Sequence, residues 1–293
     1  MSYDLFMKPR TGVIDREEFI RFFSTRPYYR VEGEQAWYQN EDTGTHFCFE
    51  HSGRDADGDS NDEEPPEHPL SFNINYFRPS FFGKEAEPEV HSFIRTFDLV
   101  VDDPQIDGMG VGEYDSAKFL TGWAAGNELG YQAVLGQGRP GRVYTLPSAE
   151  IERTWRWNLQ RTQRQSGLGK MHFVPRIAFL DVEGAVKSAA VWPDAIPSLL
   201  PQVDLLIVGR DQLAPRGFLR RKRDTVLIRW EDVAGLIHRH SSVGATRGFL
   251  LNYQSPPADV SEYIKGIRAS SPKLEIIAED AVLDAELVAK YTT

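Results

Sequence analysis

The sequence predicts a mixed fold of the α+β / α/β classes, in which an N-terminal β-α-β-β-β-α-β layered domain precedes a larger mixed α/β domain. Short runs that alternate apolar and polar residues, as in 70–76, are typical of half-buried strands. Longer segments with apolar residues at helical spacing, such as 115–135, indicate helices. With 293 residues, 41% of them hydrophobic, the chain can bury one large core or two smaller ones.

The first hundred residues are expected to place helices on one face of a mostly antiparallel sheet. Asp15 and Glu18 have capping-box spacing, which indicates the start of a helix. A polar connection that ends in Gly44 separates two strand-like runs at hairpin distance. The expected strands are 3–7, 35–39, 45–50, 70–76 and 99–101, and a second helix is expected over about 88–97.

The segment 102–112 is rich in Asp, Pro and Gly and indicates a domain boundary. We therefore expect an acidic α+β domain in 1–107 and a mixed α/β domain in 113–293. The second domain is expected to begin with helix 115–135 and to continue with a long helix from Ser148, which glycines at 167 and 169 end. Strand-like runs follow at 171–180, 186–192, 205–208, 226–230, 249–253 and 274–278, and a last helix at 281–291.

Charge is distributed unevenly along the chain. Residues 1–110 contain 23 acidic and 10 basic side chains, hence −13, whereas 111–293 contain 20 acidic and 23 basic, hence +3. An acidic surface repels nucleic acid and anionic membranes and attracts basic proteins. The charge therefore argues against direct nucleic-acid binding by the N-terminal part and favours a basic protein partner.

Two features predict a cytoplasmic protein that does not enter the membrane. No run of about 18 apolar residues occurs, and Asp4 and Lys8 interrupt the stretch that a secretory signal would need. The single cysteine, Cys48, cannot form an internal disulfide and lies in an alternating apolar run, so we expect a small buried side chain in a reducing compartment.

The segment 51–69 contains seven acidic residues and no side chain that could anchor a core, so we expect a surface loop. Its alternating aspartates invite a calcium interpretation, but Gly58 precedes Asp59 and Pro66 stands where a bidentate glutamate is required. A solvated loop or a docking surface for a protein fits better. The predicted partner-binding residues are Glu41, Asp42, Asp55, Asp57, Asp59, Asp62, Glu63 and Glu64.

No motif for catalysis, for a cofactor or for a metal is recognisable, so we predict none of the three. Gly108, Gly110 and Gly112 follow a strand, but Glu113 occupies the position of the third glycine of a dinucleotide turn. No phosphate-binding loop and no zinc-ligand spacing of histidines occurs.

Arginines with neighbouring tryptophans could bind single-stranded nucleic acid. One set, Arg153, Arg156, Arg161 and Arg164, lies on the long helix with Trp155 and Trp157; the other comprises Arg216, Arg220, Arg221, Lys222 and Arg223. The favoured interpretation is that Trp155 packs in the core and the arginines form the solvated face.

Four segments resemble a group of bacterial cytoplasmic proteins: YDLFMKPR at 3–10, RPYY at 26–29, YQNEDTG at 38–44 and FLTGWAAGN at 119–127. That group is associated with immunity proteins of secreted antibacterial toxins, particularly toxins of type VI secretion. The resemblance implies a non-enzymatic protein that binds a cognate toxin or effector, such as a nuclease, and neutralises it. It implies no catalytic residue and no cofactor.

Two other functions remain open at the level of sequence. A metal-assisted hydrolase would use His172, Asp181 and Glu183, which fall on one predicted strand and turn. A regulatory or scaffold module would bind a peptide or a second copy of itself.

Overall fold

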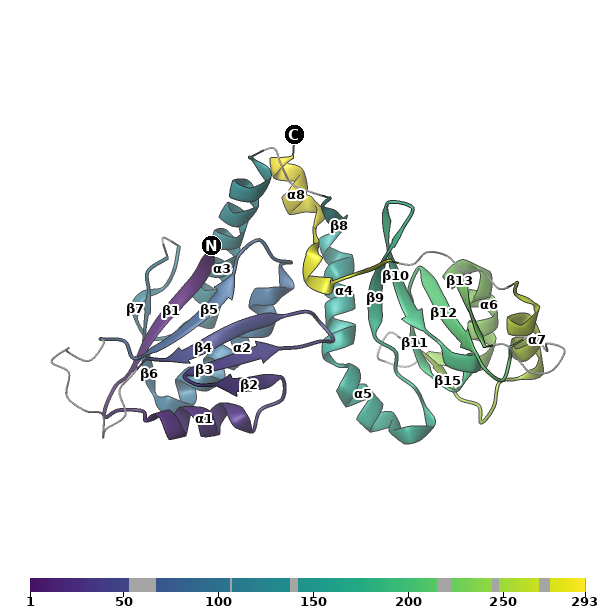
Figure 1. Ribbon diagram of the computed structural model, residues 1–293, viewed down its shortest axis with the longest axis horizontal. Coiled ribbons are helices and arrows are strands. Elements are labelled where there is room, and N and C mark those ends of the chain that lie inside the picture. The colour runs from purple at the N-terminus through teal and green to yellow at the C-terminus, as the bar shows by residue number, and fades with distance from the viewer. Residues whose placement is uncertain are drawn as a thin grey trace. The chain divides into compact units, whose positions relative to one another are not determined.

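The computed structural model describes residues 1–52, 67–105, 107–137, 142–214, 223–243, 248–268 and 275–292. The chain divides into two compact units (Figure 1). The first comprises Met1–Glu152 with Leu283–Thr293, and the second comprises Arg153–Val282. Both units combine helices with sheets, so the predicted mixed α/β class is confirmed.

A seven-stranded antiparallel sheet is the centre of the first unit, with strand order β2-β3-β4-β5-β1-β6-β7. The first strand of the chain therefore lies inside the sheet, hydrogen-bonded to β5 and to β6. The strands are β1 (Ser2–Pro9), β2 (Tyr29–Glu32), β3 (Gln35–Gln39), β4 (His46–His51), β5 (Leu70–Asn75), β6 (Leu99–Asp103) and β7 (Gly110–Gly112).

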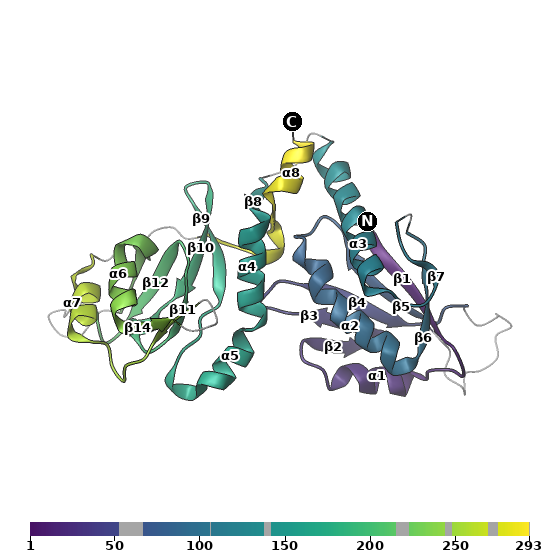
Figure 2. The same cartoon turned by 180° about the vertical axis from the view of Figure 1, so that it is seen from behind.

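Three helices pack on one face of this sheet: α1 (Arg16–Ser24), α2 (Phe81–Phe97) and α3 (Ser116–Leu135). Helices α2 and α3 lie behind the sheet in Figure 1 and in front of it in Figure 2. The contacts are aromatic: the ring of Phe49 lies 4.9 Å from that of Phe23 and 5.0 Å from that of Phe93, and Phe72 lies 5.9 Å from Phe119. The predicted layering, with helices on one face of an antiparallel sheet, is confirmed.

Local signals located several elements correctly. The capping box is present: Asp15 accepts from the Glu18 amide, and the Glu18 side chain accepts from the Asp15 amide. The hairpin of β3 and β4 lies where the polar connection predicted it. Strand β2 was not predicted, because its four residues between Pro27 and Gly33 are too few for a periodic pattern.

Helix α2 begins seven residues earlier than expected, at Phe81, and contains Pro88 in its interior. An interior proline costs about 3 kcal/mol. Phe81 and Phe82, 2% and 0% exposed, offset that cost, because burial of each such side chain contributes about 1.5–3 kcal/mol. Tertiary packing therefore outweighs the local proline signal.

The expected boundary at 107–113 lies inside the first unit. Val101, Asp102 and Asp103 of β6 pair with Gly112, Val111 and Gly110 of β7, so the Gly-rich segment is a connection within one sheet. The division falls instead within α4 (Ser148–Leu159), between Glu152 and Arg153. Sequence composition marks loops, but it does not distinguish a loop within a sheet from a linker.

The C-terminal residues return to the first unit, which no local pattern predicts. Helix α8 (Ala285–Tyr291) packs against α3, where Lys290 and Tyr291 both donate to Glu128. The Asp284 carboxylate is fully buried and accepts from the amide and the hydroxyl of Ser80, each at 2.8 Å. Strand β17 (Val282–Asp284) forms a two-stranded sheet with β8 (Tyr144–Leu146).

The second unit contains a five-stranded mixed sheet of order β13-β12-β10-β9-β16. Only β10 and β12 pair in parallel. The strands are β9 (Ile177–Val182), β10 (Ala185–Val191), β12 (Leu205–Arg210), β13 (Asp224–Arg229) and β16 (Glu275–Ile277); β11 (Leu199–Pro201), β15 (Gly248–Leu251) and β14 (Ser241–Val243) form a smaller sheet. The helices are α5 (Arg161–Leu168), α6 (Trp230–His240) and α7 (Ala258–Gly266), with 3-10 turns at Gly169–Met171, Pro193–Ala195 and Glu279–Ala281.

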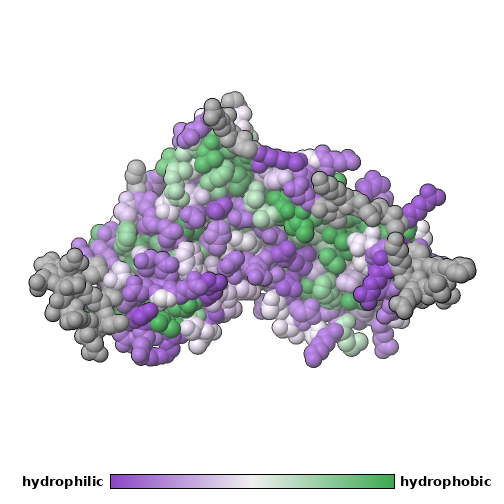
Figure 3. All heavy atoms as spheres, viewed as in Figure 1, coloured by the Kyte–Doolittle hydropathy of each residue, from purple (hydrophilic) through white to green (hydrophobic). Residues whose placement is uncertain are grey.

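The two faces of this five-stranded sheet carry separate apolar clusters. On one face Leu206 and Ile228 join a core with Val233 of α6 and Ile264 of α7. On the other face Leu180, Ala189 and Leu205 form a smaller cluster that includes partly buried side chains, and hydrophobic atoms gather over β9, β10 and β12 in Figure 3. The alternation along β9, β10 and β12 therefore directs apolar side chains to both faces of the sheet.

A buried carboxylate fixes the loop between β3 and β4. Glu85 of α2 is 3% exposed, and its oxygens accept from the side chains of Tyr38, Asn40, Thr43 and Thr45 at 2.7–3.0 Å. A buried charge is tolerated only when such donors replace its water. Glu85 therefore joins α2 to the loop that carries the predicted partner-binding residues Glu41 and Asp42.

Glu85→Ala should lower the stability of the first unit by about 3 kcal/mol, because it leaves several buried donors without an acceptor. We expect a lower urea midpoint and faster hydrogen exchange of the amides in residues 42–45. Glu17→Ala, at an exposed position of α1, is the matched control and should change neither. Unchanged exchange in Glu85→Ala would show that the carboxylate does not hold this loop.

Candidate functional site

The face of the seven-stranded sheet opposite α1, α2 and α3 carries the outward residues of all its strands. The register places one residue of each strand in a continuous row: Glu32, Gln35, Glu50, Ser71, Phe6, Asp102 and Val111. A neighbouring row crosses five strands: Arg30, Trp37, Cys48, Asn73 and Asp4. We call these two rows the open sheet face.

Large apolar side chains are exposed on the open sheet face. Trp37 is 42% exposed, Phe6 38% and Val111 73%. On the helix-covered side, by contrast, Phe47, Phe49 and Phe72 are at most 2% exposed. An antiparallel sheet with one solvated face usually carries polar residues there, so the exposed aromatics make this face a candidate binding surface.

The open sheet face is also acidic. Its two rows contain the four carboxylates of Asp4, Glu32, Glu50 and Asp102 against the one guanidinium of Arg30. Lys8, which follows Phe6 on the same side of β1, is ion-paired with Glu67. Arg30 is ion-paired with Glu32. The surface that remains is therefore one of exposed apolar groups between negative charges, and Figure 3 shows this side of the unit as largely hydrophilic.

Hydrogen bonds hold the central side chains of this face in place. The Trp37 indole N–H donates to Gln35 Oε1 at 3.2 Å, and Gln35 Nε2 donates to Glu50 Oε2 at 3.2 Å. Asn73 Nδ2 donates to Asp4 Oδ1 at 2.5 Å. Because its N–H is already satisfied within the sheet, Trp37 presents its ring as an oriented apolar surface.

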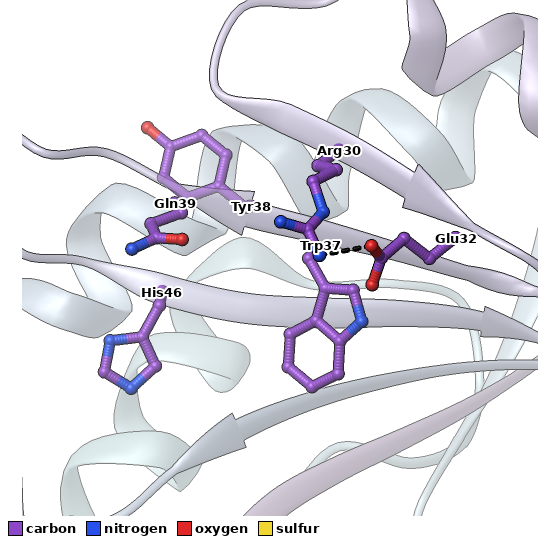
Figure 4. A pocket seen from close by; sticks show the side chains of 6 residues that line it. All are labelled: Arg30, Glu32, Trp37, Tyr38, Gln39 and His46. Atoms are coloured by element: carbon purple, nitrogen blue, oxygen red, sulfur yellow. Dashed lines mark hydrogen bonds and ion pairs between the residues drawn. The ribbon is translucent and has the colours of Figure 1, made fainter.

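A pocket of about 390 Å³ lies at the end of the open sheet face formed by β2, β3 and β4. It is lined by Arg30, Glu32, Trp37, Tyr38, Gln39 and His46, which Figure 4 shows around the Arg30–Glu32 ion pair. Its chemistry is that of an aromatic wall with charged and amide groups at the rim. Such a pocket suits a side chain of a partner or a small amphipathic group.

The predicted partner-binding residues do not all lie within the described chain. Glu41 is exposed and Asp42 half-buried in the loop between β3 and β4, where the Asp42 amide donates to Asn40 Oδ1 at 3.1 Å. The remaining ones, Asp55, Asp57, Asp59, Asp62, Glu63 and Glu64, lie outside the described residues.

Glu41 and Asp42 lie at the opposite end of β4 from the described attachment points of the acidic segment, Ser52 and Glu67. Six residues of strand separate the two ends, which corresponds to about 20 Å. The open sheet face lies between them. Glu41 and Asp42 therefore lie at the other end of β4 from the two points at which the acidic segment joins the described chain.

Of the residues of the alternative hydrolase, Asp181 and Glu183 have other local roles. Asp181 is 7% exposed and accepts from the Gly184 amide at 2.8 Å, while Glu183, with φ of 52°, occupies the turn between β9 and β10. His172 follows a 3-10 turn, and within the described ranges neither of its ring nitrogens has a hydrogen-bond partner. Across the same ranges no group of three His, Cys, Asp or Glu side chains could hold a metal ion.

Of the three glycines near 110, Gly108 is required by packing. A Cβ at Gly108 would lie 2.4 Å from the Asp103 side chain, whose Oδ2 accepts from the Met109 amide at 3.0 Å and from the Tyr3 hydroxyl at 2.5 Å. Asp103 is 2% exposed, so only glycine fits beside it. The glycine at 108 is thus explained by a buried carboxylate and needs no phosphate ligand.

The predicted long arginine-rich helix is two helices, α4 and α5, and its arginines also have a structural explanation. Trp155 and Trp157 are 8% and 5% exposed, which confirms that Trp155 packs in the core. The Arg164 guanidinium lies 4.4 Å from the Trp157 ring centre. In the second basic set Arg223 pairs with Asp211 at 3.0 Å, and Arg216, Arg220, Arg221 and Lys222 lie outside the described residues.

Sequence reasoning missed the open sheet face, although a signal was present. In β3, Ala36 and Tyr38 have the phase of the buried side chains, so Trp37 between them must point to the other side. The two neighbouring rows that bring Trp37 and Phe6 onto one face with four carboxylates depend on strand order and register. Neither of these can be read from one strand alone.

Comparison of the chain with protein-family models, with curated proteins and with solved structures gives no match in any of the three. The kinship with immunity proteins therefore stays a prediction. None of the helices within the described ranges is both long and apolar enough to cross a membrane.

Cys48 on the open sheet face should not react as an accessible thiol. It is 5% exposed, and its burial, with the nearby Glu50 carboxylate, raises the pKa of the thiol to about 12. Since the thiolate is the reactive form, Ellman's reagent at pH 8 should label native protein more slowly than protein in 6 M guanidinium, by about tenfold or more. Rapid labelling of the native protein would mean that solvent and reagent reach the Cys48 thiol in the folded state.

Proposed function

We propose that the protein is a non-enzymatic immunity protein that binds a basic toxin or effector domain in the bacterial cytoplasm and blocks it. The observation that supports this proposal is the open sheet face, where exposed Trp37 and Phe6 lie among four carboxylates. An exposed aromatic surface favours a protein partner. Its negative charge favours a basic one.

The charge of the first unit is consistent with the same partner. A toxin that acts on nucleic acid must attract an anionic substrate and therefore carries a basic surface. An acidic inhibitor can compete for that surface by charge complementarity. Glu41 and Asp42, at one end of the open sheet face, would add to the attraction.

A regulatory or scaffold module is the second candidate, because the same surface could hold a basic peptide from a protein that is not a toxin. The metal-assisted hydrolase draws no support from the positions of Asp181 and Glu183, which are used by a turn. A pull-down distinguishes the first two functions. One stoichiometric toxin-like partner supports the immunity function, and a partner that is no toxin supports the module.

The tagged protein should retain the product of the adjacent gene, expressed as an inactive variant, and should release it as salt is raised. Screening weakens the attraction between exposed charges, so association at 0.5 M NaCl should be slower than at 0.05 M NaCl. Stopped-flow or surface-plasmon measurements give both rate constants. Failure to bind at either salt concentration would reject this partner.

Neutralising Asp55, Asp57, Asp59, Asp62, Glu63 and Glu64 to Ser or Gln should slow association roughly 3-fold or more at low salt and change dissociation little. Glu41→Gln with Asp42→Asn should act in the same direction. The matched control, Glu150→Gln with Asp98→Asn, alters exposed carboxylates elsewhere in the first unit. An association rate equal to that of the wild type would remove the acidic segment from the encounter surface.

A further inference from the structure

We infer that the open sheet face is the docking surface and that an arginine or lysine side chain of the partner stacks on the ring of Trp37. This inference rests on the proposed function and specifies its contact. The pocket beside Trp37, about 390 Å³ in volume, is large enough for such a side chain. The proposed occupant is a basic protein that is anchored at Trp37.

Trp37 is the one exposed tryptophan of the chain. The others, Trp123, Trp155, Trp157, Trp192 and Trp230, are between 1% and 8% exposed, whereas Trp37 is 42% exposed. Tryptophan is enriched among the residues that dominate binding energy at protein interfaces. The hydrogen bond from its N–H to Gln35 leaves the ring face for a ligand and limits the rotamers that binding must freeze.

The surroundings of Trp37 favour a cation. Glu50 lies one strand away through the Gln35 bridge, and Glu32 lies on the pocket rim. A cation over an indole ring is attracted by the ring quadrupole, and a nearby carboxylate adds Coulomb attraction. Arg30 and Glu32 form an ion pair on the pocket rim, so their charges largely cancel, and Glu50 supplies the remaining negative charge beside Trp37.

The width of the surface favours a folded protein over a single side chain or a nucleic acid. Trp37 on β3 and Phe6 on β1 are separated by three strand spacings, which corresponds to about 14 Å. Phe6 thus offers a second apolar contact for the same partner. Single-stranded nucleic acid also stacks on aromatics, but it requires a positive groove, and this face carries four carboxylates.

The test measures binding of the inactive adjacent-gene product to the wild type, Trp37→Ala and Trp37→Phe. We expect Trp37→Ala to weaken binding about tenfold or more and Trp37→Phe to recover part of the loss. Val13→Ala, at a 76% exposed position outside the open sheet face, is the control for a neutral surface change. Fluorescence of the five buried tryptophans verifies that each variant is folded.

Quenching of tryptophan by acrylamide provides a readout specific to Trp37, since it is the exposed one. The bound partner should lower the fraction of wild-type tryptophan fluorescence that acrylamide quenches. Binding of the wild type and Trp37→Ala with equal affinity, or unchanged quenching in the complex, would overturn the inference and leave the proposed function standing.

If the adjacent-gene product does not bind the wild type at all, the proposed pairing fails. The inference is then tested by the binding of peptides. A hexa-arginine peptide should then protect Trp37 from acrylamide, and the effect should diminish in Glu32→Gln with Glu50→Gln. A hexa-glutamate peptide and a single-stranded oligonucleotide should have no effect. Protection by the oligonucleotide, or none by hexa-arginine, would overturn the inference.

Discussion

Pairing of β1 with a strand on each side determines which residues of the first unit face the helices. Leu5 lies opposite Phe72 of β5, and Met7 lies opposite Val101 of β6, so both apolar side chains enter the core. A slip by one residue would bury Asp4 and expose Leu5. Burial of an uncompensated carboxylate costs several kcal/mol, so the register is strongly specified. The two rows of the open sheet face, and the acidic and aromatic character they combine, follow from this register.

Some of the carboxylates of the first unit are buried and hydrogen-bonded inside the fold. Glu85, Asp103 and Asp284 are at most 3% exposed, and each accepts hydrogen bonds from a different loop or helix start. Burial, and the hydrogen bond to Asp103, raise the pKa of Tyr3, which keeps the phenol protonated as a donor. The net charge of the sequence therefore overstates the charge available to a partner. Under the proposed function, a partner would meet the smaller set of carboxylates on the open sheet face and in the loop that bears Glu41 and Asp42.

Local sequence patterns predicted most elements but not their long-range arrangement. The Asp15 capping box, the hairpin ending in Gly44 and the alternation of 70–76 each depend on neighbouring residues, so they were visible. The division inside α4 and the return of α8 to the first unit depend on contacts between residues more than a hundred positions apart, such as Asp284 with Ser80. The candidate site was hidden for the same reason: Trp37 and Phe6 share a face only through the strand order β3-β4-β5-β1.

An inhibitor of a basic protein has to meet two physical demands, and different parts of the first unit suit each. Fast encounter depends on exposed charge, which needs no fixed geometry and suits loops such as the one bearing Glu41 and Asp42. Slow dissociation depends on desolvated, well-oriented contacts, which need a rigid support. Trp37 has such a support, because its strand is paired on both sides and its N–H is tied to Gln35. Charge in the flanking segments would then govern how often a partner arrives, and the ordered sheet face would govern how long it stays.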